Sequence, residues 1–491
     1  MHDSRYGYRH LLTFIVIVGL FTIHSVGITI RADAQVSASG PASISLAGGG
    51  PAFVYGSEAI FRNPANLALD RSGMVELSIG GAGVSAGGNL LQFRHYNNLF
   101  TSGRTISEDD ARMVVNDWFD GAESLSLKRV GVAAETVPLS VIHEMGDLVF
   151  GYGLRVRAMS SVGINGGWLD LLLSGTGQDR SIPLMGEFSV MSTTEISAAV
   201  AKTFNDGRLA VGVSPKLVLG NEFVDARLRS TAHVSNEAIV HDFEYTVRAA
   251  GGLSRDVVDG IDLFSSDVFG GSSFRPRLLS TAGVGAGLDF GVTFLPSPGL
   301  RLSASVTDAG FVRWKRDAQL ITPVANQFSF EGLVLDIDRV RDEFGGDLGE
   351  YFTSTIDSLA SGTYDQVDRA YAPFTAALPT AIHFGAAWIA PGGRLTLTGG
   401  TSAPISSSVV QVASPPELHV GVEYSVGGSV RVPLRTGLFV GGSSALTLGI
   451  GIGIHTSRYD FDIGIAASPR TDIIGAGGRY TGGVSALTIR F

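Results

Sequence analysis

The chain has 491 residues, of which 65 are glycine, none is cysteine and only 17% are charged. The absence of cysteine excludes disulfides, thiolate metal sites and a lipoprotein anchor. The formal net charge of −10 argues against nonspecific nucleic-acid binding, which needs a basic surface. The length is large for a single soluble core but ordinary for a large barrel.

The N-terminus has the organisation of a secretory signal peptide. Arg5 and Arg9 precede an apolar run over 11–30, and small residues follow at Ala32 and Ala34. This pattern predicts a signal peptide over residues 1–34, cleaved before Gln35. The alternative is an N-terminal membrane anchor, because the run is nearly long enough to span a bilayer. No other stretch approaches the ~20 apolar residues of a membrane helix, so any further insertion must use strands.

Residues 41–69 are rich in Gly, Pro, Ser and Ala and lead into Asn63-Pro64-Ala65. The Gly and Pro density argues against a long helix or strand before Ser57. This segment resembles the N-terminus of the FadL-type outer-membrane transporter superfamily, PorV-like barrels included, in which an Asn-Pro-Ala motif precedes the first strand. The resemblance implies that residues 35–72 form a hatch, or plug, inside a barrel. The alternative for the tripeptide is a capped turn, because proline moves its predecessor out of the helical region.

From Met74 onward, short segments alternate between apolar and polar or small side chains, a period of two that predicts strands. The clearest are 152–157, 224–229, 242–249, 382–388, 418–424, 446–455 and 459–465. Segments of ~10 residues with one apolar face are typical of membrane barrels. In lipid every backbone amide must be paired, so such a sheet has to close on itself.

A soluble sandwich would show similar alternation, but two features favour the membrane. Aromatic residues lie at strand ends, as in an interfacial girdle: Trp388, Tyr424 and Tyr459. The polar faces carry charges of both signs, which suits a wet or salt-bridged lumen. The predicted fold class is therefore all-β, a transmembrane antiparallel β-barrel over residues 73–491, set in the lipid of the bacterial outer membrane.

The last residues also read as a strand, with Leu487, Ile489 and Phe491 on one face. A chain that stops on an aromatic residue resembles the closing strand of an outer-membrane barrel. The resemblance implies that Phe491 is an assembly signal for the barrel assembly machinery.

Charged residues on the polar faces of the predicted strands are the candidates for the lumen. Opposite charges on neighbouring strands suggest cross-strand pairing. These lumen-facing candidates are Arg155, Arg157, Asp225, Arg227, Arg229, Glu244, Arg248, Glu423, Asp460 and Asp462.

Two inserts break the strand pattern. Residues 107–120 begin with Ser107 and Asp110, which are spaced as a capping box at the start of a short acidic helix. Residues 336–369 carry apolar side chains at helical spacing and nine carboxylates against three arginines. This acidic insert suggests a lid, a partner-docking surface or a divalent-cation site, or a solvated amphipathic pair of helices.

Three further segments resemble a large family of uncharacterised outer-membrane barrels, distantly FadL- and PorV-like. They are Ser303–Trp314, Phe330-Glu-Gly332 before the acidic insert, and Leu378-Pro379-Thr380. The resemblance implies 14 strands, and an even count places both termini in the periplasm. Asp308 continues the lipid-facing row of Leu302, Ala304 and Val306. A carboxylate facing mid-bilayer lipid is unfavourable, so we expect Asp308 beyond the apolar band, capping a turn at Gly310.

The sequence gives no sign of enzymatic chemistry. Gly83-Val-Ser85-Ala-Gly87 matches the hydrolase G-x-S-x-G pattern but lies in a glycine-rich strand, whereas that chemistry needs a strand-to-helix turn. No histidine pair has metal-ligand spacing on a helix, and Asp336 and Asp338 match only two positions of a calcium loop. We expect no enzyme activity, no metal site and no cofactor.

Two functions fit the predicted fold. The FadL-like resemblance implies a passive transporter or channel for small or hydrophobic solutes, closed by the hatch. The alternative is a PorV-like barrel that does not transport and instead binds a periplasmic or surface protein partner through its acidic insert and loops. The fold supports both, so the preference for transport rests on analogy.

Overall fold

The computed structural model describes residues 40–46, 50–69, 75–90, 107–174, 179–235, 238–252, 280–330, 337–345, 366–406, 416–441, 444–468 and 478–491, with isolated positions between some of these ranges. The predicted signal peptide and its cleavage site lie outside the described residues. Within the described ranges, no helix is both long and apolar enough to cross a bilayer.

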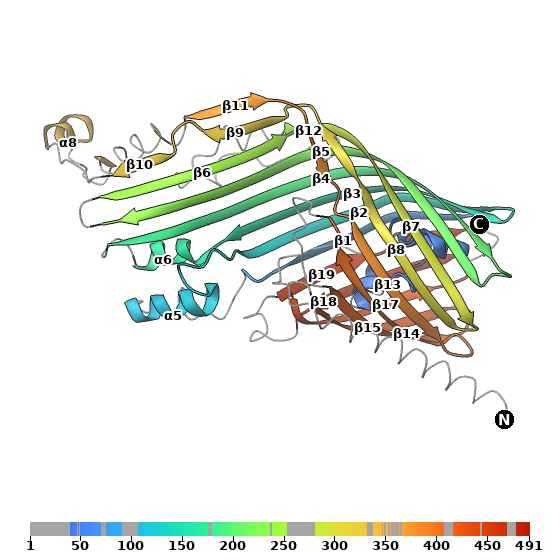
Figure 1. Ribbon diagram of the computed structural model, residues 1–491. Helices are drawn as coiled ribbons and strands as arrows, with labels where there is room; N and C mark the ends of the chain where they lie inside the picture. The colour runs from blue at the N-terminus through green and yellow to red at the C-terminus, as the bar shows by residue number, and fades with distance from the viewer. Residues whose placement is uncertain are drawn as a thin grey trace.

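The strands form one closed antiparallel barrel of 14 strands, as predicted (Figure 1). The barrel closes because β1 pairs with β2 on one side and with both β19 and β20 on the other. In order around the barrel the strands are β1 (Glu76–Gly88), β2 (Lys128–Met145), β3 (Leu148–Ile164), β4 (Arg180–Phe204), β5 (Leu209–Val234), β7 (Gly283–Ser297), β8 (Leu300–Trp314), β13 (Ala381–Ile389), β14 (Leu395–Pro404), β15 (Glu417–Gly427), β16 (Arg431–Gly441), β17 (Ser444–His455), β18 (Tyr459–Ala467), and β19 (Gly478–Val484) continued by β20 (Leu487–Arg490).

Short turns gather at one end of the barrel. They join β2 to β3, β4 to β5, β7 to β8, β13 to β14, β15 to β16, and β17 to β18. Strand β1 begins at this end and β20 finishes there, since Glu76 pairs with Arg490. Short turns mark the periplasmic end of bacterial barrels. This end is therefore periplasmic, and the C-terminus lies there.

At the opposite, outer end of the barrel, several strands are much longer than is needed to cross a membrane. β4 and β5 have 25 and 26 residues, whereas a membrane strand needs only ~9–11. Their outer halves form a sheet that projects from the barrel in Figure 1. The added strands are β6 (Ile239–Ala250), β9 (Gln319–Pro323), β10 (Gln327–Phe330), β11 (Val367–Tyr371) and β12 (Phe374–Ala377). The segment 242–249, which alternates like a barrel strand, belongs to this extension as part of β6.

In the described ranges, three helices lie at this outer end: α5 (Glu108–Phe119), α6 (Gly166–Ser174) and α8 (Ile337–Glu343). The predicted capping box of α5 is confirmed, because the Ser107 side chain accepts from the Asp110 amide and the Asp110 side chain accepts from the Ser107 amide. Of the acidic insert, the structure describes α8 and isolated positions before β11.

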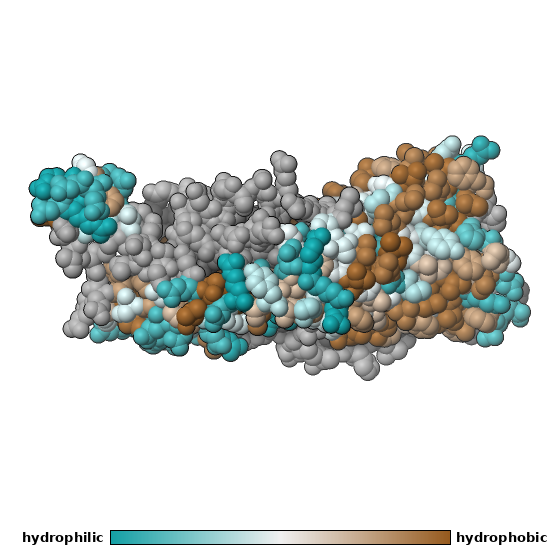
Figure 2. Space-filling view, turned by 90° about the horizontal axis from the view of Figure 1, so that it is seen from above, coloured by the Kyte–Doolittle hydropathy of each residue, from teal (hydrophilic) through white to brown (hydrophobic). Residues whose placement is uncertain are grey.

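The outer face of the barrel is apolar. Ile450, Ile452 and Ile454 on β17 are each about half exposed, and hydrophobic residues, in brown, predominate on the barrel part of the face shown in Figure 2. Of the three predicted girdle residues, Tyr424 and Tyr459 are exposed near the periplasmic strand ends. Trp388 is instead only 8% exposed, because it packs in a cluster with Leu300.

Candidate functional site

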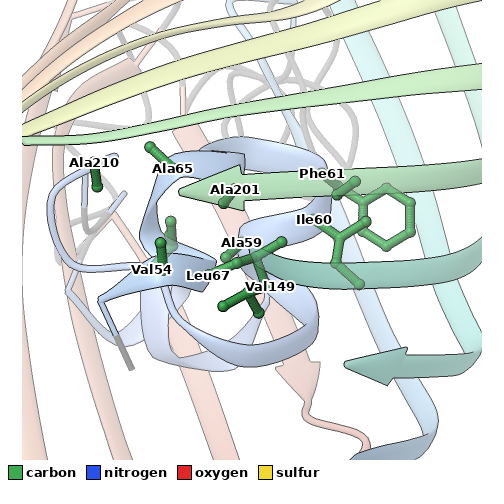
Figure 3. Close-up of a cluster of buried hydrophobic side chains, with 11 residues drawn as sticks. Val54, Ala59, Ile60, Phe61, Ala65, Leu67, Val149, Ala201 and Ala210 are labelled. Atoms are coloured by element: carbon green, nitrogen blue, oxygen red, sulfur yellow. The ribbon is translucent and has the colours of Figure 1, made fainter. Parts of the chain in front are cut away.

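The N-terminal segment fills the periplasmic half of the lumen. It comprises α2 (Pro41–Ser45), α3 (Gly56–Arg62) and the short 3-10 helix η1 (Pro64–Ala68), and we call residues 40–69 the hatch. Helix α2 contacts β16–β19, whereas α3 and η1 contact β2–β5, β7 and β8. The hatch therefore spans the barrel from wall to wall. Figure 3 shows its apolar side chains, Ile60 and Leu67 among them, packed with Val149 and Ala201 of the wall.

Glycines on the inner wall make room for this segment. A Cβ at Gly437 would lie 2.6 Å from the Leu46 carbonyl oxygen, one at Gly385 would lie 2.8 Å from a ring carbon of Pro51, and one at Gly212 would collide with the Pro64–Ala65 backbone. Real Cβ atoms do not approach so closely, so the hatch backbone rests directly on a wall without side chains. Part of the unusual glycine content of the chain thus serves the fit of the hatch.

Asn63, of the Asn63-Pro64-Ala65 motif, is completely buried and ties the hatch to itself and to the wall. Its amide nitrogen donates to the Pro51 carbonyl at 2.9 Å and to the Thr293 hydroxyl of β7 at 3.0 Å. Its carbonyl oxygen accepts from the Ala65 amide at 3.3 Å, so the motif also has the capped-turn geometry. Asn66 adds donations to the Pro51 and Val54 carbonyls.

Outward of the hatch lies a group of buried charges that we call the ionic layer. It is formed by Arg155, Arg157, Glu195, Lys216, Asp289 and Asp308, all at most 8% exposed. Asp308 accepts from Arg155 at 2.9 Å and from Lys216 at 2.6 Å, and Lys216 also pairs with Asp289 at 2.7 Å. Three cations face three carboxylates, so the layer is neutral. Phe61 of the hatch lies against it, with its ring 4.7 Å from the Arg155 guanidinium carbon.

The prediction for Asp308 is wrong. Strand β8 runs through this position without a turn, and Asp308 points into the lumen rather than lying beyond the apolar band. The pairing of β7 with β8 slips between Leu288 and Phe290, and Asp308 has a left-handed φ of 57°. Such an irregularity reverses which side chains face inward. Its amide donates to the Asp289 carboxylate at 2.6 Å, which stabilises the bulge.

A layer of apolar side chains follows the ionic layer toward the outer end. Its centre is Trp314, which packs on Phe223 with ring centroids 5.2 Å apart, and Phe223 packs on Phe374 at 5.0 Å. Met191 and Leu378 belong to the same buried cluster. On the β3–β8 side, the lumen is therefore filled by three successive layers: the hatch, the ionic layer and this apolar layer.

The remaining lumen candidates from the sequence lie in two other places. Asp225 pairs with Arg248 across β5 and β6, and it shares this outer site with three exposed side chains: Arg227, Arg229 and Glu244. Those positions belong to the projecting sheet and not to the membrane band. Glu423, Asp460 and Asp462 lie near the periplasmic end, on β15 and β18.

At that periplasmic site the wall holds the hatch through Tyr55. Arg435, which sequence reasoning missed, binds Glu423 at 2.7 Å and also Asp462. Its guanidinium donates to the Tyr55 hydroxyl at 3.1 Å. His455 lies 3.0 Å from Asp462. The hatch is thus attached to the wall at Tyr55 on one side and at Asn63 on the other.

The barrel wall is irregular next to the hatch, where the pairing of three neighbouring strands is disturbed at the same height of the barrel. β1 kinks at Gly80, with φ of 81°, and its pairing with β2 skips that residue. β2 bulges between Thr136 and Leu139. The last strand is interrupted between Val484 of β19 and Leu487 of β20. We call this place the wall break.

Cavities lie on both sides of the wall break. Inside, between the hatch and the wall, is a cavity of about 90 Å³, and outside is an open apolar groove of about 580 Å³. Ala82, Gly83, Glu135 and Val484 line both. A third cavity, of about 510 Å³, lies at the periplasmic end of the hatch. It shares Tyr55, Asp460 and Arg490 with the inner cavity.

Besides misplacing Asp308, sequence reasoning missed five charged residues that matter here: Glu135, Glu195, Lys216, Asp289 and Arg435. One signal was present, because a charged side chain within a membrane strand is expected to face the interior and to be paired. Among the described residues, no group of histidine and acidic side chains has the arrangement of a metal site.

Residues 64–463 match the model of a family of unknown function, DUF5723. The chain belongs to this family. No curated protein matches it.

Solved structures with a similar overall fold include two toluene transporters and a FadL homologue. The toluene transporter TbuX of Ralstonia pickettii is 13% identical, with 92% of this chain and 98% of that chain covered and a TM-score of 0.46. A FadL homologue of Pseudomonas aeruginosa is 12% identical, with 94% and 99% covered and a TM-score of 0.44. The toluene transporter TodX of Pseudomonas putida is 11% identical, with 93% and 98% covered and a TM-score of 0.42. The expectation of an uncharacterised family of outer-membrane β-barrels is confirmed by the family match and by the closed 14-strand barrel.

Proposed function

We propose that the protein is a passive outer-membrane transporter for small hydrophobic solutes, which pass between the membrane and the lumen through the wall break. The observation that carries the proposal is the set of four residues that line both the apolar groove on the lipid face and the cavity behind it: Ala82, Gly83, Glu135 and Val484. An apolar solute concentrates in lipid, because transfer of apolar surface out of water is favourable. A passage through the side wall therefore serves such a solute better than an aqueous pore.

The hatch limits where a solute can go after it has entered through the wall break. It closes the direct path along the barrel, whereas the inner cavity adjoins the periplasmic cavity through Tyr55, Asp460 and Arg490. The proposed route leads from the lipid face, through the wall break and past the hatch, to the periplasmic end. In this proposal residues 1–34 are removed on export and Phe491 directs assembly.

A disulfide across the wall break tests the proposal, and the chain contains no cysteine to interfere. A Cβ at Gly81 would lie 3.6 Å from the Ala486 Cβ, within the range of about 3.5–4.5 Å found in disulfides. The variant Gly81→Cys/Ala486→Cys therefore links β1 to the last strand at this point. The measurement is uptake of radiolabelled 1-dodecanol by intact cells that express the barrel.

We expect oxidation of the double variant to lower uptake to that of cells without the barrel, and a reductant to restore it. Each single cysteine variant serves as a control and retains wild-type uptake under both conditions. Unchanged uptake by the oxidised double variant, with the disulfide verified by mass spectrometry, refutes passage through the wall break.

A further inference from the structure

The inner cavity has a charge that distinguishes one class of solute. Five carboxylates and two guanidinium groups line it: Glu58, Glu76, Glu135, Asp460 and Asp462 against Arg62 and Arg490. Arg62 lies 3.5 Å from Glu58, and Arg490 pairs with Glu76 and Asp460. Asp462 is bound by Arg435, which does not itself line the cavity. The lining is therefore acidic, which disfavours an anionic solute.

Among the carboxylates that line the inner cavity, Glu135 has the weakest ion pairing. In the described part of the chain its one ion pair joins its Oε2 to Arg155 Nη1 at 3.8 Å. Arg155 is already bound more closely by Glu195 and Asp308. The three cations of the ionic layer are matched by the three carboxylates of that layer, so Glu135 is a fourth carboxylate without a cation of its own. It also lines the lipid-facing groove.

Asp460 provides a second acceptor. It is only 8% exposed, and its Oδ1 atom accepts no hydrogen bond within the described residues, although its other oxygen is paired with Arg490. A buried carboxylate oxygen without a donor is unfavourable and is normally satisfied by a partner. A donor bound in the inner cavity supplies that partner.

The volumes of the inner cavity and of the lipid-facing groove suit different parts of an amphiphilic solute. The inner cavity measures about 90 Å³, against about 580 Å³ for the apolar groove outside, so the smaller, charged cavity suits a head group and the larger groove suits an alkyl chain. The groove is lined by Val84, Ile463 and Ile465 among others. An alkyl chain fits there, on the lipid side of the same wall break.

From this arrangement we propose that the transported solutes are cationic amphiphiles, whose ammonium head group binds Glu135 and Asp460 in the inner cavity while the alkyl chain lies in the lipid-facing groove. This inference rests on the proposed function and specifies its substrate class. A primary alkylamine carries its charge at neutral pH, as the lysine amine does, and donates three hydrogen bonds. A fatty acid of the same length has no donor when ionised, and its carboxylate would face those of Glu135 and Asp460.

The experiment measures equilibrium binding of three radiolabelled probes to the full chain in nanodiscs of phosphatidylcholine, with empty nanodiscs as background. The probes are dodecylamine, 1-dodecanol and dodecanoate, which share the alkyl chain and differ in the head group. We expect dodecylamine to bind at least about tenfold more tightly than dodecanoate, since a hydrogen bond to a charged group contributes about 1.5–3 kcal/mol and 1.4 kcal/mol is tenfold in affinity.

Two variants locate the head group. Glu135→Gln and Asp460→Asn should each weaken dodecylamine binding by about tenfold and leave 1-dodecanol binding unchanged. Glu108→Gln is the matched control, because it removes the same charge from a largely exposed position on α5. A shift in gel mobility on boiling confirms that each variant has folded.

The outcomes separate this inference from the proposed function. If 1-dodecanol and dodecanoate bind above background and dodecylamine binds no more tightly, the substrate class is wrong and the transporter stands. If no probe binds above background, both proposals are refuted. Dodecylamine binding that resists both substitutions places the head group elsewhere and overturns the assignment to Glu135 and Asp460.

Discussion

The fit of the hatch against bare glycines makes Gly437→Ala an informative perturbation. The new Cβ would lie 2.6 Å from the Leu46 carbonyl oxygen and 2.8 Å from its Cα, so the hatch backbone has to move. Leu46 is completely buried, and the strand itself tolerates alanine because Gly437 is not among the residues with positive φ. The substitution therefore acts on the hatch and spares the barrel.

The magnitude follows from the cost of overpacking. Forcing an extra methyl group into a packed interior costs about 1–3 kcal/mol. If that strain is relieved when the hatch leaves its place, the ratio of open to closed barrels rises by about 5- to 150-fold. The assay is ion conductance of single barrels in a planar bilayer. Deletion of residues 36–56, which removes α2 and Tyr55, gives the reference for a barrel without this part of the hatch.

Gly482→Ala is the matched control, because its Cβ would lie 3.8 Å from the nearest atom, Ile465 Cγ2, and contact nothing in the hatch. We expect the control to conduct like the wild type and Gly437→Ala to open far more often. If Gly437→Ala stays closed while the deletion opens the barrel, the contact at Leu46 does not hold the hatch in place. If the deletion also stays closed, residues 36–56 do not plug the lumen at all.

Two further predictions concern charge. Lys216→Met removes a buried cation that pairs with Asp289 and Asp308. Because it leaves the ionic layer with two cations against three buried carboxylates, it should lower the free energy of unfolding by about 3–5 kcal/mol. Lys202→Met removes a partly exposed lysine 3.5 Å from Asp147 and should change the free energy of unfolding by less than about 1 kcal/mol. Urea unfolding followed by tryptophan fluorescence measures both variants, and equal losses would contradict the role of burial. Sign reversal at four acidic insert positions tests the partner hypothesis: a protein that co-purifies with the wild type should be lost, and its retention would exclude the insert as the docking surface. The positions are Asp342, Glu343, Asp347 and Glu350.

The sequence predicted the barrel because its evidence is local and repeated. A period of two is set by the geometry of each strand, so Ile450 and Ile452 could be placed on the lipid face without knowledge of their neighbours. The hatch was placed by resemblance, since nothing in residues 41–69 says which surface they contact.

The interior charges were harder to predict, because inward orientation depends on bulges. Asp308 follows three outward-facing residues, and only the slip between β7 and β8 turns it inward. A similar slip opposite Ser192 changes the inward row of β5. Such irregularities arise from the pairing of two strands, and neither strand alone encodes them. Arg227 and Arg229 lie outside the membrane band, because β5, with 26 residues, is much longer than a membrane strand.

The route of the hatch across the barrel bears on the order in which the protein folds. Tyr55 contacts Asp462, a residue 407 positions further along the chain, and Leu46 contacts Gly437. Contacts between such distant segments form late, because the chain entropy of bringing them together opposes them until the intervening structure exists. The hatch is translated first and yet docks among the last strands to be made. We therefore expect the nascent barrel to stay unplugged until β16–β19 are in place, because these strands complete both the binding surface of α2 and the last part of the sheet.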